Sequence, residues 1–486
     1  MNTNEDVRLF ISALTGLVLS VVVYWGAFSK NRKADPALRS ARYDPVFNPF
    51  QLVWLFAILA VAGVVIARSR VVVLPLMVSL VLEIAFYYGA LLLALPLLRK
   101  AFRPSTVAAL WLLPNFLYLT CYNFMLSSGP KVVLPVSIGF SYWPFLVWGV
   151  GFLAVMGWTV SRHLAYRKEL LRDAKPVTDP EILAIWDDEA YALGLENPKL
   201  TLVRSTATAT PLSIGIWRKT TRVVLPERNY TPEELRLILR HELIHIRHGD
   251  PSTKLFLAFC QAACWFNPLM WFAMRRCADD LELGCDELVL TDADNNTRET
   301  YARLVLRTAG DERGFTTCLS VRAKSLRYRL RGIVSRRKKL VGGLLVGLLT
   351  AALLLGNGLV AVAYAPSRGE DVIFHGHSVD YEPVHISSSP LNGWFPYEYH
   401  IFTCTDVPAL NRYLSGLTLY RLSSLYNPQG EYLSISMNND SVDIRLYDHM
   451  VSVSRWDGTK YLGERLYYSL EPLDKDYLQT LLADAP

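Results

Sequence analysis

The segment His241–His245 has the residue types and the spacing of a catalytic metal site. It reads His-Glu-Leu-Ile-His, which is an H-E-x-x-H motif. Two histidines four residues apart lie on one face of a helix, so both imidazoles can bind the same metal ion. Glu242 is turned partway round the helix axis, where it can take a proton from an activated water without being a ligand. The motif therefore predicts a zinc peptidase with Glu242 as its general base.

A catalytic zinc site needs a third protein ligand and leaves one position open. The acidic stretch Asp279–Glu287 reads as a helix in which Glu282 and Asp286 share one face. We expect Glu282 to be the third ligand and Asp286 to accept the free N–H of a ligand histidine. The alternatives are a solvated acidic helix face, or His248 or Cys285 as the ligand. A small, buried apolar role suits Cys285 better.

The element that must hold the motif is marked at both of its ends. Thr231 is a suitable N-cap, Pro232 suits the first helical position, and Glu234 completes a capping box. Gly249 ends the helix. In the region before this helix, the sequence predicts a helix at Pro180–Leu193 and strands at Lys199–Val203 and Arg222–Leu225. The segment Pro211–Trp217 lies between these two strands. An edge strand within 198–227 is expected to hold an extended substrate by backbone pairing.

The composition indicates an integral membrane protein. Of the 486 residues, 51% are hydrophobic, and the mean hydropathy is +0.21. Apolar runs predict roughly six spans at the ~20-residue criterion. They are Leu9–Phe28, Leu52–Ala67, Val71–Leu98, Val107–Phe124, Ile138–Val160 and Leu340–Ala363. Residues 1–8 lack the basic start of a cleaved signal peptide, so the first span is expected to be retained. We attribute the net charge of +6 to Lys and Arg in cytoplasmic loops, and we expect no direct nucleic-acid binding.

Basic residues flank the region 162–339 at both ends, which predicts a cytoplasmic location for it. Arg68 and Arg70 then fall outside, either in a re-entrant pair or as a tolerated exception. The basic run Arg327–Lys339 is read as a membrane-flanking anchor. We expect a multi-pass α-helical membrane protein with a cytoplasmic α+β gluzincin-like zinc peptidase domain and a small extracellular α+β domain. Its predicted parts are 1–161 with about five spans, the peptidase domain 162–339, a final transmembrane helix 340–364, and a sensor-like domain 365–486.

The apolar stretch Leu255–Met274 sets a constraint on this topology. It is long enough to span a membrane, but a span here would put Glu282 and the two histidines on opposite sides. Either the stretch does not span, or Glu282 is not a ligand. Asn267-Pro268 in its middle favours a buried or interfacial helix that keeps the zinc site close to the inner leaflet. Glu83, within a predicted span, should be functional or paired.

The region 365–486 predicts a small α+β domain. Strands are expected at Tyr397–Phe402, Tyr432–Met437, Val442–Leu446 and Met450–Trp456, and helices at Val407–Leu414 and Asp474–Leu482. Cys404 is alone in this region, so no internal disulfide is expected. His375 and His377 are interpreted as an exposed linker pair rather than a metal site.

The order of the motifs resembles the BlaR/MecR family of membrane zinc metallopeptidases, the signal-transducing receptors and antirepressors of Gram-positive bacteria. The resemblance covers about residues 160–340 and is carried by the H-E-x-x-H helix continuing to Asp250, by Cys264–Leu269, by Glu282-x-x-Cys285-Asp286-Glu287, by Pro211–Gly215 and by Leu225-Pro226. It implies Zn²⁺ bound by His241, His245 and Glu282, with Glu242 as the base. It also directs attention to Asp250 and Asp286 as partners behind the ligands.

The same resemblance implies a function. An external signal is relayed through the spans, and the cytoplasmic domain cleaves a repressor-like protein, such as a winged-helix transcriptional repressor, or the receptor itself. The implied partners are this protein substrate, membrane lipid and an unknown extracellular ligand, and a homodimer is left open. The implied location is the cell membrane of a Gram-positive bacterium. Residues 365–486 contain neither Ser-x-x-Lys nor Lys-Thr-Gly, so the penicillin-binding sensor module is absent and β-lactam sensing is not supported.

Two other functions fit part of the sequence. One is a housekeeping membrane zinc peptidase of the HtpX type, which serves protein quality control. The other is a catalytically idle receptor. The C-terminal domain favours the signalling receptor over the first, and the intact Glu242 argues against the second.

Overall fold

The computed structural model describes most of the chain from residue 70 onward. The described residues are 10, 13, 14, 17, 70–114, 117, 129–137, 143–195, 200–215, 220–291, 293–307, 317–318, 323–334, 340, 342–356, 358–375, 383–389, 400–422, 426–428, 431–437, 441–457 and 459–484. The predicted span Leu52–Ala67, nearly all of Leu9–Phe28, and His377 lie outside them.

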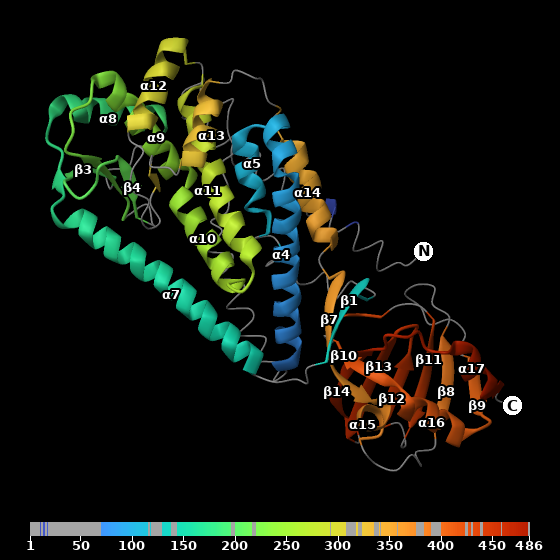
Figure 1. Cartoon of the computed structure of the whole chain (residues 1–486). Helices are drawn as coiled ribbons and strands as arrows, with labels where there is room; N and C mark the ends of the chain where they lie inside the picture. The colour runs from blue at the N-terminus through green and yellow to red at the C-terminus, as the bar shows by residue number, and fades with distance from the viewer. Residues whose placement is uncertain are drawn as a thin grey trace.

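The apolar helices α4 (Arg70–Ala101), α5 (Pro104–Leu110) and α14 (Gly343–Gly356) lie in the middle of the molecule (Figure 1). The long helix α7 (Trp143–Arg172) runs along the left side of the same view. Within the described ranges, Val78–Ala101 is the one helical segment whose length and hydropathy suffice to cross a membrane, and Gly343–Gly356 is a shorter apolar helix. Side chains of α4, α5 and α14 share one apolar cluster. Further helices lie around the upper end of α4 in Figure 1, and a large sheet lies beside its lower end.

Two predicted spans differ from the structure. The fourth was expected over Val107–Phe124, but α5 ends at Leu110 and a turn follows it. Pro114, which has no backbone N–H, agrees with this early stop. The last was expected over Leu340–Ala363, but α14 ends at Gly356 and a strand starts at Val360. Gly358, with φ +89°, makes the left-handed turn between the two.

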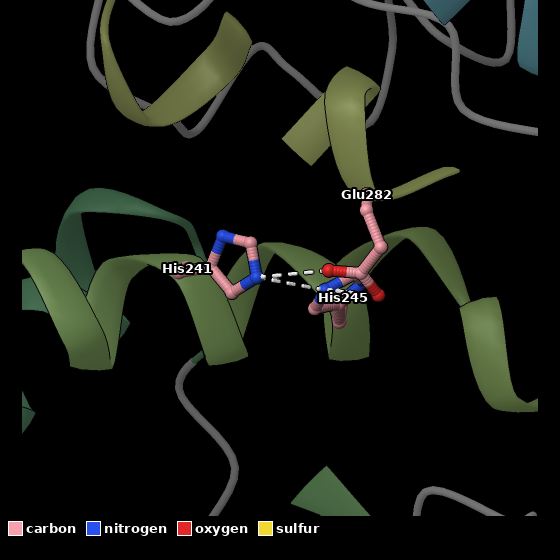
Figure 2. Close-up of side chains that lie close together, drawn as sticks. All are labelled: His241, His245 and Glu282. Carbon is pink, nitrogen blue, oxygen red and sulfur yellow. Dashed lines mark hydrogen bonds and ion pairs between the residues drawn. The ribbon is translucent and has the colours of Figure 1, made fainter. Parts of the chain in front are cut away.

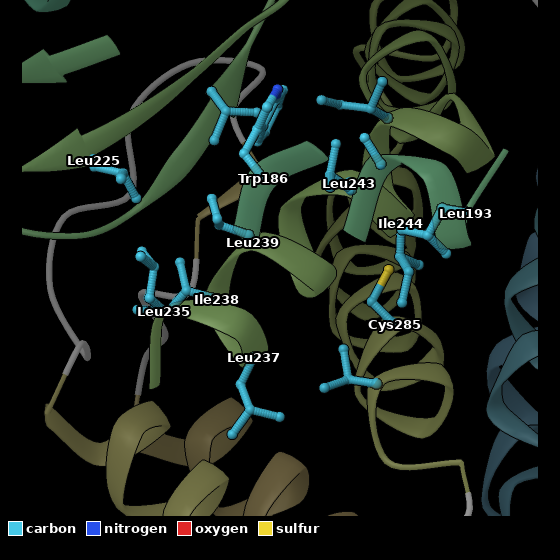
Figure 3. Close-up of a cluster of buried hydrophobic side chains, with 14 of the residues drawn as sticks. Trp186, Leu193, Leu225, Leu235, Leu237, Ile238, Leu239, Leu243, Ile244 and Cys285 are labelled. Carbon is cyan, nitrogen blue, oxygen red and sulfur yellow. The ribbon is translucent and has the colours of Figure 1, made fainter. Parts of the chain in front are cut away.

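The region 162–339, predicted as an α+β peptidase domain, contains a five-stranded sheet and, in its described part, six helices. The strand order is β2 (Lys175–Pro176), β3 (Thr201–Ser205), β5 (Arg222–Pro226), β4 (Leu212–Ile214), β6 (Thr317–Cys318), with β3 and β5 parallel. The helices are α8 (Pro180–Ala192), α9 (Pro232–His248), α10 (Asp250–Ala263), α11 (Pro268–Val289), α12 (Asn295–Arg307) and α13 (Ala323–Val334). Trp186, Leu239, Ile244 and Cys285 are part of its buried core (Figure 3).

The C-terminal region forms a ten-stranded sheet with helices α15 (Gly369–Ile373), α16 (Val407–Gly416) and α17 (Lys475–Thr480). Its strand order is β1 (Val132–Val136), β7 (Val360–Arg368), β10 (Thr418–Arg421), β14 (Lys460–Tyr468), β13 (Met450–Asp457), β12 (Val442–Leu446), β11 (Tyr432–Met437), β8 (Pro383–Ser389), β9 (His400–Cys404), β15 (Leu482–Asp484). The bounds of β11 and β12 agree with the predicted strands.

The predicted division between an N-terminal region ending at 161 and a domain starting at 365 does not hold for this sheet. Its edge strand β1 comes from the N-terminal region and pairs in parallel with β7, from Val132 opposite Val360 to Val136 opposite Tyr364. The sequence analysis did not predict β1, whose residues Val-Val-Leu-Pro-Val lie in the short loop between two predicted spans. β1 precedes α7 in the chain, so the C-terminal sheet is joined both to α14 and to the segment that leads into the peptidase region.

Candidate active site

Helix α9 carries the H-E-x-x-H motif and has the predicted ends. The hydroxyl of Thr231 accepts a hydrogen bond from the backbone N–H of Glu234 at 3.2 Å, and the Glu234 carboxylate accepts one from the N–H of Thr231 at 3.1 Å. Gly249 follows the helix in the left-handed conformation, with φ +76°. Arg240 bonds Glu189 of α8 at 2.7 Å, which fixes the helix against its neighbour. The motif is therefore held rigidly in the core.

The three residues predicted as ligands lie together (Figure 2). Nε2 of His241 is 3.0 Å from Nε2 of His245. The two carboxylate oxygens of Glu282 are 3.5 Å from Nε2 of His241 and 3.6 Å from Nε2 of His245. All three side chains are buried, and they offer ligand atoms within 4.8 Å of one another. This arrangement matches the donor set and the crowding of a three-ligand metal site.

The chain brings Glu282 to the histidines through a helical hairpin. The apolar stretch Leu255–Met274 is not one continuous helix: α10 ends at Ala263 and α11 starts at Pro268. The side chain of Asn267 caps α11 by accepting the N–H of Leu269 at 2.9 Å. The break at Asn267-Pro268 agrees with the prediction that this stretch does not span, and the return of α11 carries Glu282 back to α9.

Asp250 lies behind His245. Its carboxylate accepts the Nδ1–H of His245 at 2.5 Å, so that Nε2 is the ring nitrogen that faces Glu282. Burial raises the pKa of Asp250, but the hydrogen bond from His245 outweighs it and lowers the pKa. Cys285 Sγ is 3.2 Å from the same Nδ1. Burial raises the pKa of Cys285, so it stays a neutral thiol packed against this pair.

Asp286 acts on His241 through another residue, which corrects the prediction of a direct hydrogen bond. Its nearest oxygen is 3.6 Å from Nδ1 of His241. The hydroxyl of Tyr301, on α12, lies between them, 2.8 Å from Nδ1 and 2.7 Å from Asp286. Because Tyr301 donates to the carboxylate, it accepts the Nδ1–H of the histidine. Arg329, on α13, donates to both oxygens of Asp286, at 2.7 and 2.5 Å.

The charges around the histidines leave room for a divalent cation. Four carboxylates are buried there, those of Glu242, Asp250, Glu282 and Asp286. Two cations, Lys254 and Arg329, each lie 3.4 Å from Glu282. Burial lowers the pKa of His241 to about 4, so this imidazole is neutral at pH 7 and can donate its lone pair. Oε2 of Glu282 is buried and accepts no hydrogen bond from any described residue. The residues fit a divalent metal ion in charge and in donor type.

Some residues singled out in the sequence lie outside this site, and some residues of the site were not predicted. His248 is the last residue of α9 and belongs to neither of the groups with metal-ligand geometry among the described residues. His375 lies in a turn of the C-terminal region with φ +55°. Tyr301, Lys254 and Arg329 were not predicted. Arg329 belongs to the run interpreted as a membrane anchor, yet it is completely buried. No motif distinguishes it from its exposed neighbours Arg327 and Arg331.

Comparisons with known proteins agree with this geometry. Residues 140–333 match the family described as BlaR1 peptidase M56. Over 250 residues the chain is 24% identical to the regulatory protein BlaR1 of Bacillus licheniformis. This alignment covers 49% of the chain and 41% of the relative, so the chain spans less than half of that protein's length. Both matches confirm the family resemblance that the motifs predicted.

Proposed function

Because the chain belongs to the BlaR1-type family of M56 metallopeptidases, we propose that it is a membrane zinc endopeptidase of the gluzincin type. The observation that carries the proposal is the meeting of His241, His245 and Glu282, with the buried Glu242 next to His241 in the same helix. Two imidazoles and a carboxylate are a donor set that Zn²⁺ uses in catalytic sites. A bound zinc ion would polarise the scissile carbonyl and acidify a water molecule.

The protein's own residues orient the site and move the proton. Asp250 and the Tyr301–Asp286 pair fix the two imidazoles so that each presents Nε2. Glu242 is the group we assign to take a proton from the attacking water and to return it to the leaving amine. Its burial in the core keeps bulk water from competing for that proton.

The strand β4 is the edge on which we place the substrate. It lies next to β5 in the sheet beside α9, and its other side pairs antiparallel with residues 317–318 of the same chain. An antiparallel partner on β4 has the extended backbone that a peptidase substrate adopts. We therefore infer that the segment around Thr317 occupies the substrate edge in the resting protein. Self-cleavage in this segment, or its displacement by another protein, follows from that placement.

The signalling role rests on the connections of the C-terminal sheet. We propose that α4, α7 and α14 are among roughly six membrane spans, with the peptidase region in the cytoplasm and the C-terminal sheet outside a bacterial cell. Glu83 in α4 accepts the N–H of Gly358 at 2.9 Å, and Tyr426 of the C-terminal region donates to the carbonyl of Gly358 at 3.1 Å. An external ligand that moves the sheet would thus act on both α4 and α14. The cleaved protein would be a cytoplasmic repressor, for which a winged-helix repressor is the candidate, or the chain itself; a homodimer is compatible with this scheme.

The test is the Glu242→Gln variant in the full-length protein. Wild type is expected to cleave itself or a repressor encoded beside it, and the variant to lose this activity by about 10²- to 10⁴-fold while keeping its bound zinc. Glu299→Gln, an exposed position on α12, is the matched control. Equal cleavage by wild type and Glu242→Gln would overturn the proposal and favour a receptor without catalysis.

A further inference from the structure

Helix α13 packs directly on the helix that carries the third candidate ligand. We propose that its residues Tyr328 and Arg329 are positioning residues for Glu282, and that docking of α13 on α11 sets the metal affinity of the site. The proposal rests on the proposed metal site, but assigns to α13 a role that the catalytic scheme does not require.

Two adjacent residues of α13 hold two buried carboxylates of α11. The hydroxyl of Tyr328 lies 3.4 Å from Asp280. Arg329 makes its two bonds to Asp286, and its Nη1 lies 3.4 Å from Oε2 of Glu282. Asp280 precedes Glu282 by two residues and Asp286 follows it by four, so the contacts bracket the ligand on both sides. A planar guanidinium bonded to a carboxylate at two points fixes direction as well as distance.

The two helices are in close contact beside the ligand. A Cβ atom at Gly332 would lie 2.4 Å from a methyl carbon of Leu283, the residue directly after Glu282. Even the methyl group of alanine therefore cannot fit at position 332 unless α13 or Leu283 moves. The backbone of the same helix end is also bonded: Arg298 of α12 donates to the carbonyl of Ile333 at 3.0 Å. The docked position of α13 is thus closely defined.

The same cluster reaches the end of the apolar helix α4. Arg99, in its last turn, bonds Asp280 at 2.8 Å and lies over the ring of Tyr328 at 4.4 Å. Trp111 donates to the other oxygen of Asp280 at 3.0 Å. Beyond α13, Leu340 pairs with the backbone after α4, with its N–H donating to Ala101 at 2.9 Å. The end of α4 therefore contacts α11 and α13 at one joint, two residues from a metal ligand, and the residue Leu340 before α14 pairs with the same end of α4.

This joint gives the apolar helices a route to the site. A shift of α4 or α14 would move α13 and release Arg329 from Asp286. Asp286 would then hold Tyr301 less firmly, and Glu282 would lose a neighbouring cation. Both changes weaken the orientation of metal ligands, an effect that costs about 10- to 100-fold in affinity when outer partners are removed. Metal affinity would thus depend on how α13 is docked.

The experiment uses the purified full-length protein in detergent and measures Zn²⁺ affinity by competition with a chelator. Gly332→Ala is expected to weaken zinc binding about 10- to 100-fold, although it touches no ligand. Leu283→Ala in the same chain removes the methyl groups that clash and should restore affinity to within about threefold of the Leu283→Ala protein alone, as expected for coupled neighbours. Gly343→Ala, with open space around its Cβ, is the control. Arg329→Lys, which keeps the charge and loses the planar fork, should also weaken zinc binding.

The outcomes separate this proposal from the proposed function. A wild-type protein that binds no zinc would overturn the metal site and the role of α13 together. If wild type binds zinc, and Gly332→Ala and Arg329→Lys lower the melting temperature but bind zinc as tightly, α13 has only a structural role and the proposal fails. If Gly332→Ala does not fold, Arg329→Lys and the rescued double variant decide the question by the same measurement.

Discussion

Nδ1 of His241 donates its proton to the hydroxyl of Tyr301 across 2.8 Å, and this hydroxyl donates its own to Asp286. The orientation of the imidazole thus depends on a side chain sixty residues away in the sequence. Replacing Tyr301 by Phe removes the hydroxyl and keeps the ring. We expect zinc affinity to fall about 10- to 100-fold, because the histidine loses the partner that fixes its tautomer. Chelator competition on the purified protein measures this loss.

Tyr191→Phe is the matched control for this change, because Tyr191 is an exposed tyrosine on α8. It should leave zinc affinity unchanged. Asp286→Asn should resemble Tyr301→Phe, since the amide no longer offers two anionic oxygens to Tyr301 and Arg329. A Tyr301→Phe protein with the zinc affinity of wild type would show that Asp286 and Tyr301 do not orient His241.

The pair of histidines also predicts a pH dependence of metal binding. Burial lowers the pKa of His245, but the Glu282 carboxylate and the hydrogen bond to Asp250 outweigh it and raise the pKa well above its ordinary value. A metal ion at Nε2 must therefore displace a proton. Below the pKa of His245, zinc affinity should rise about tenfold for each unit of increasing pH. Calorimetry in two buffers of different ionisation enthalpy would detect the released proton; heats that do not depend on the buffer would contradict this.

The residues around α9 show what a sequence can predict and where it stops. The cap at Thr231, the stop at Gly249 and the shared face of His241 and His245 follow from local rules, because helix ends and i,i+4 faces depend on near neighbours. The contact of Tyr301 with His241 follows from no local rule, since it depends on how α12 packs against α9. Asp286 was therefore placed on the correct side of the site but one residue too close to the histidine.

The apolar segments show a second limit. A hydropathy profile depends on residue type alone, so α14 and the first residues of β7 appear as one apolar run. In the structure, Gly358 separates this helix from this strand. The strand character of Val360–Arg368 comes from its pairing with β1, more than 200 positions earlier in the chain. A pairing over such a distance leaves no periodic signal near either strand, so the shared sheet could not be predicted.

The capping box at the start of α9 should contribute to stability without touching catalysis. Thr231→Ala removes the hydroxyl that accepts the N–H of Glu234 and is expected to cost about 1 kcal/mol. For a domain of this size that lowers the melting temperature by about 2–4 °C. Thr231→Ser, which keeps the hydroxyl, should have the melting temperature of wild type. Zinc affinity at 25 °C should be equal in all three proteins, since the cap lies more than two turns from His241; a loss of affinity in Thr231→Ala would show that the motif is less rigid than the structure indicates.

The pairing of β6 with β4 predicts how the resting enzyme is restrained. Leu212 lies opposite Cys318 and Ser213 opposite Thr317, so two residues of the chain cover the edge that an added substrate would need. Replacing both Thr317 and Cys318 by Pro removes their backbone N–H groups and weakens this pairing. We expect the variant to cleave a fluorescent casein with a lower KM than wild type and an unchanged kcat, because the edge is freed while the site at His241 is untouched.

The control is Thr317→Ala with Cys318→Ala, which keeps both N–H groups. This control should retain the KM of wild type. An equal KM in the proline variant and wild type would mean that substrate does not use the β4 edge. A proline variant with lower kcat and unchanged KM would mean that residues 317–318 support the site rather than cover it. Only a fall in KM specific to proline agrees with an edge that the protein's own chain occupies until it is displaced.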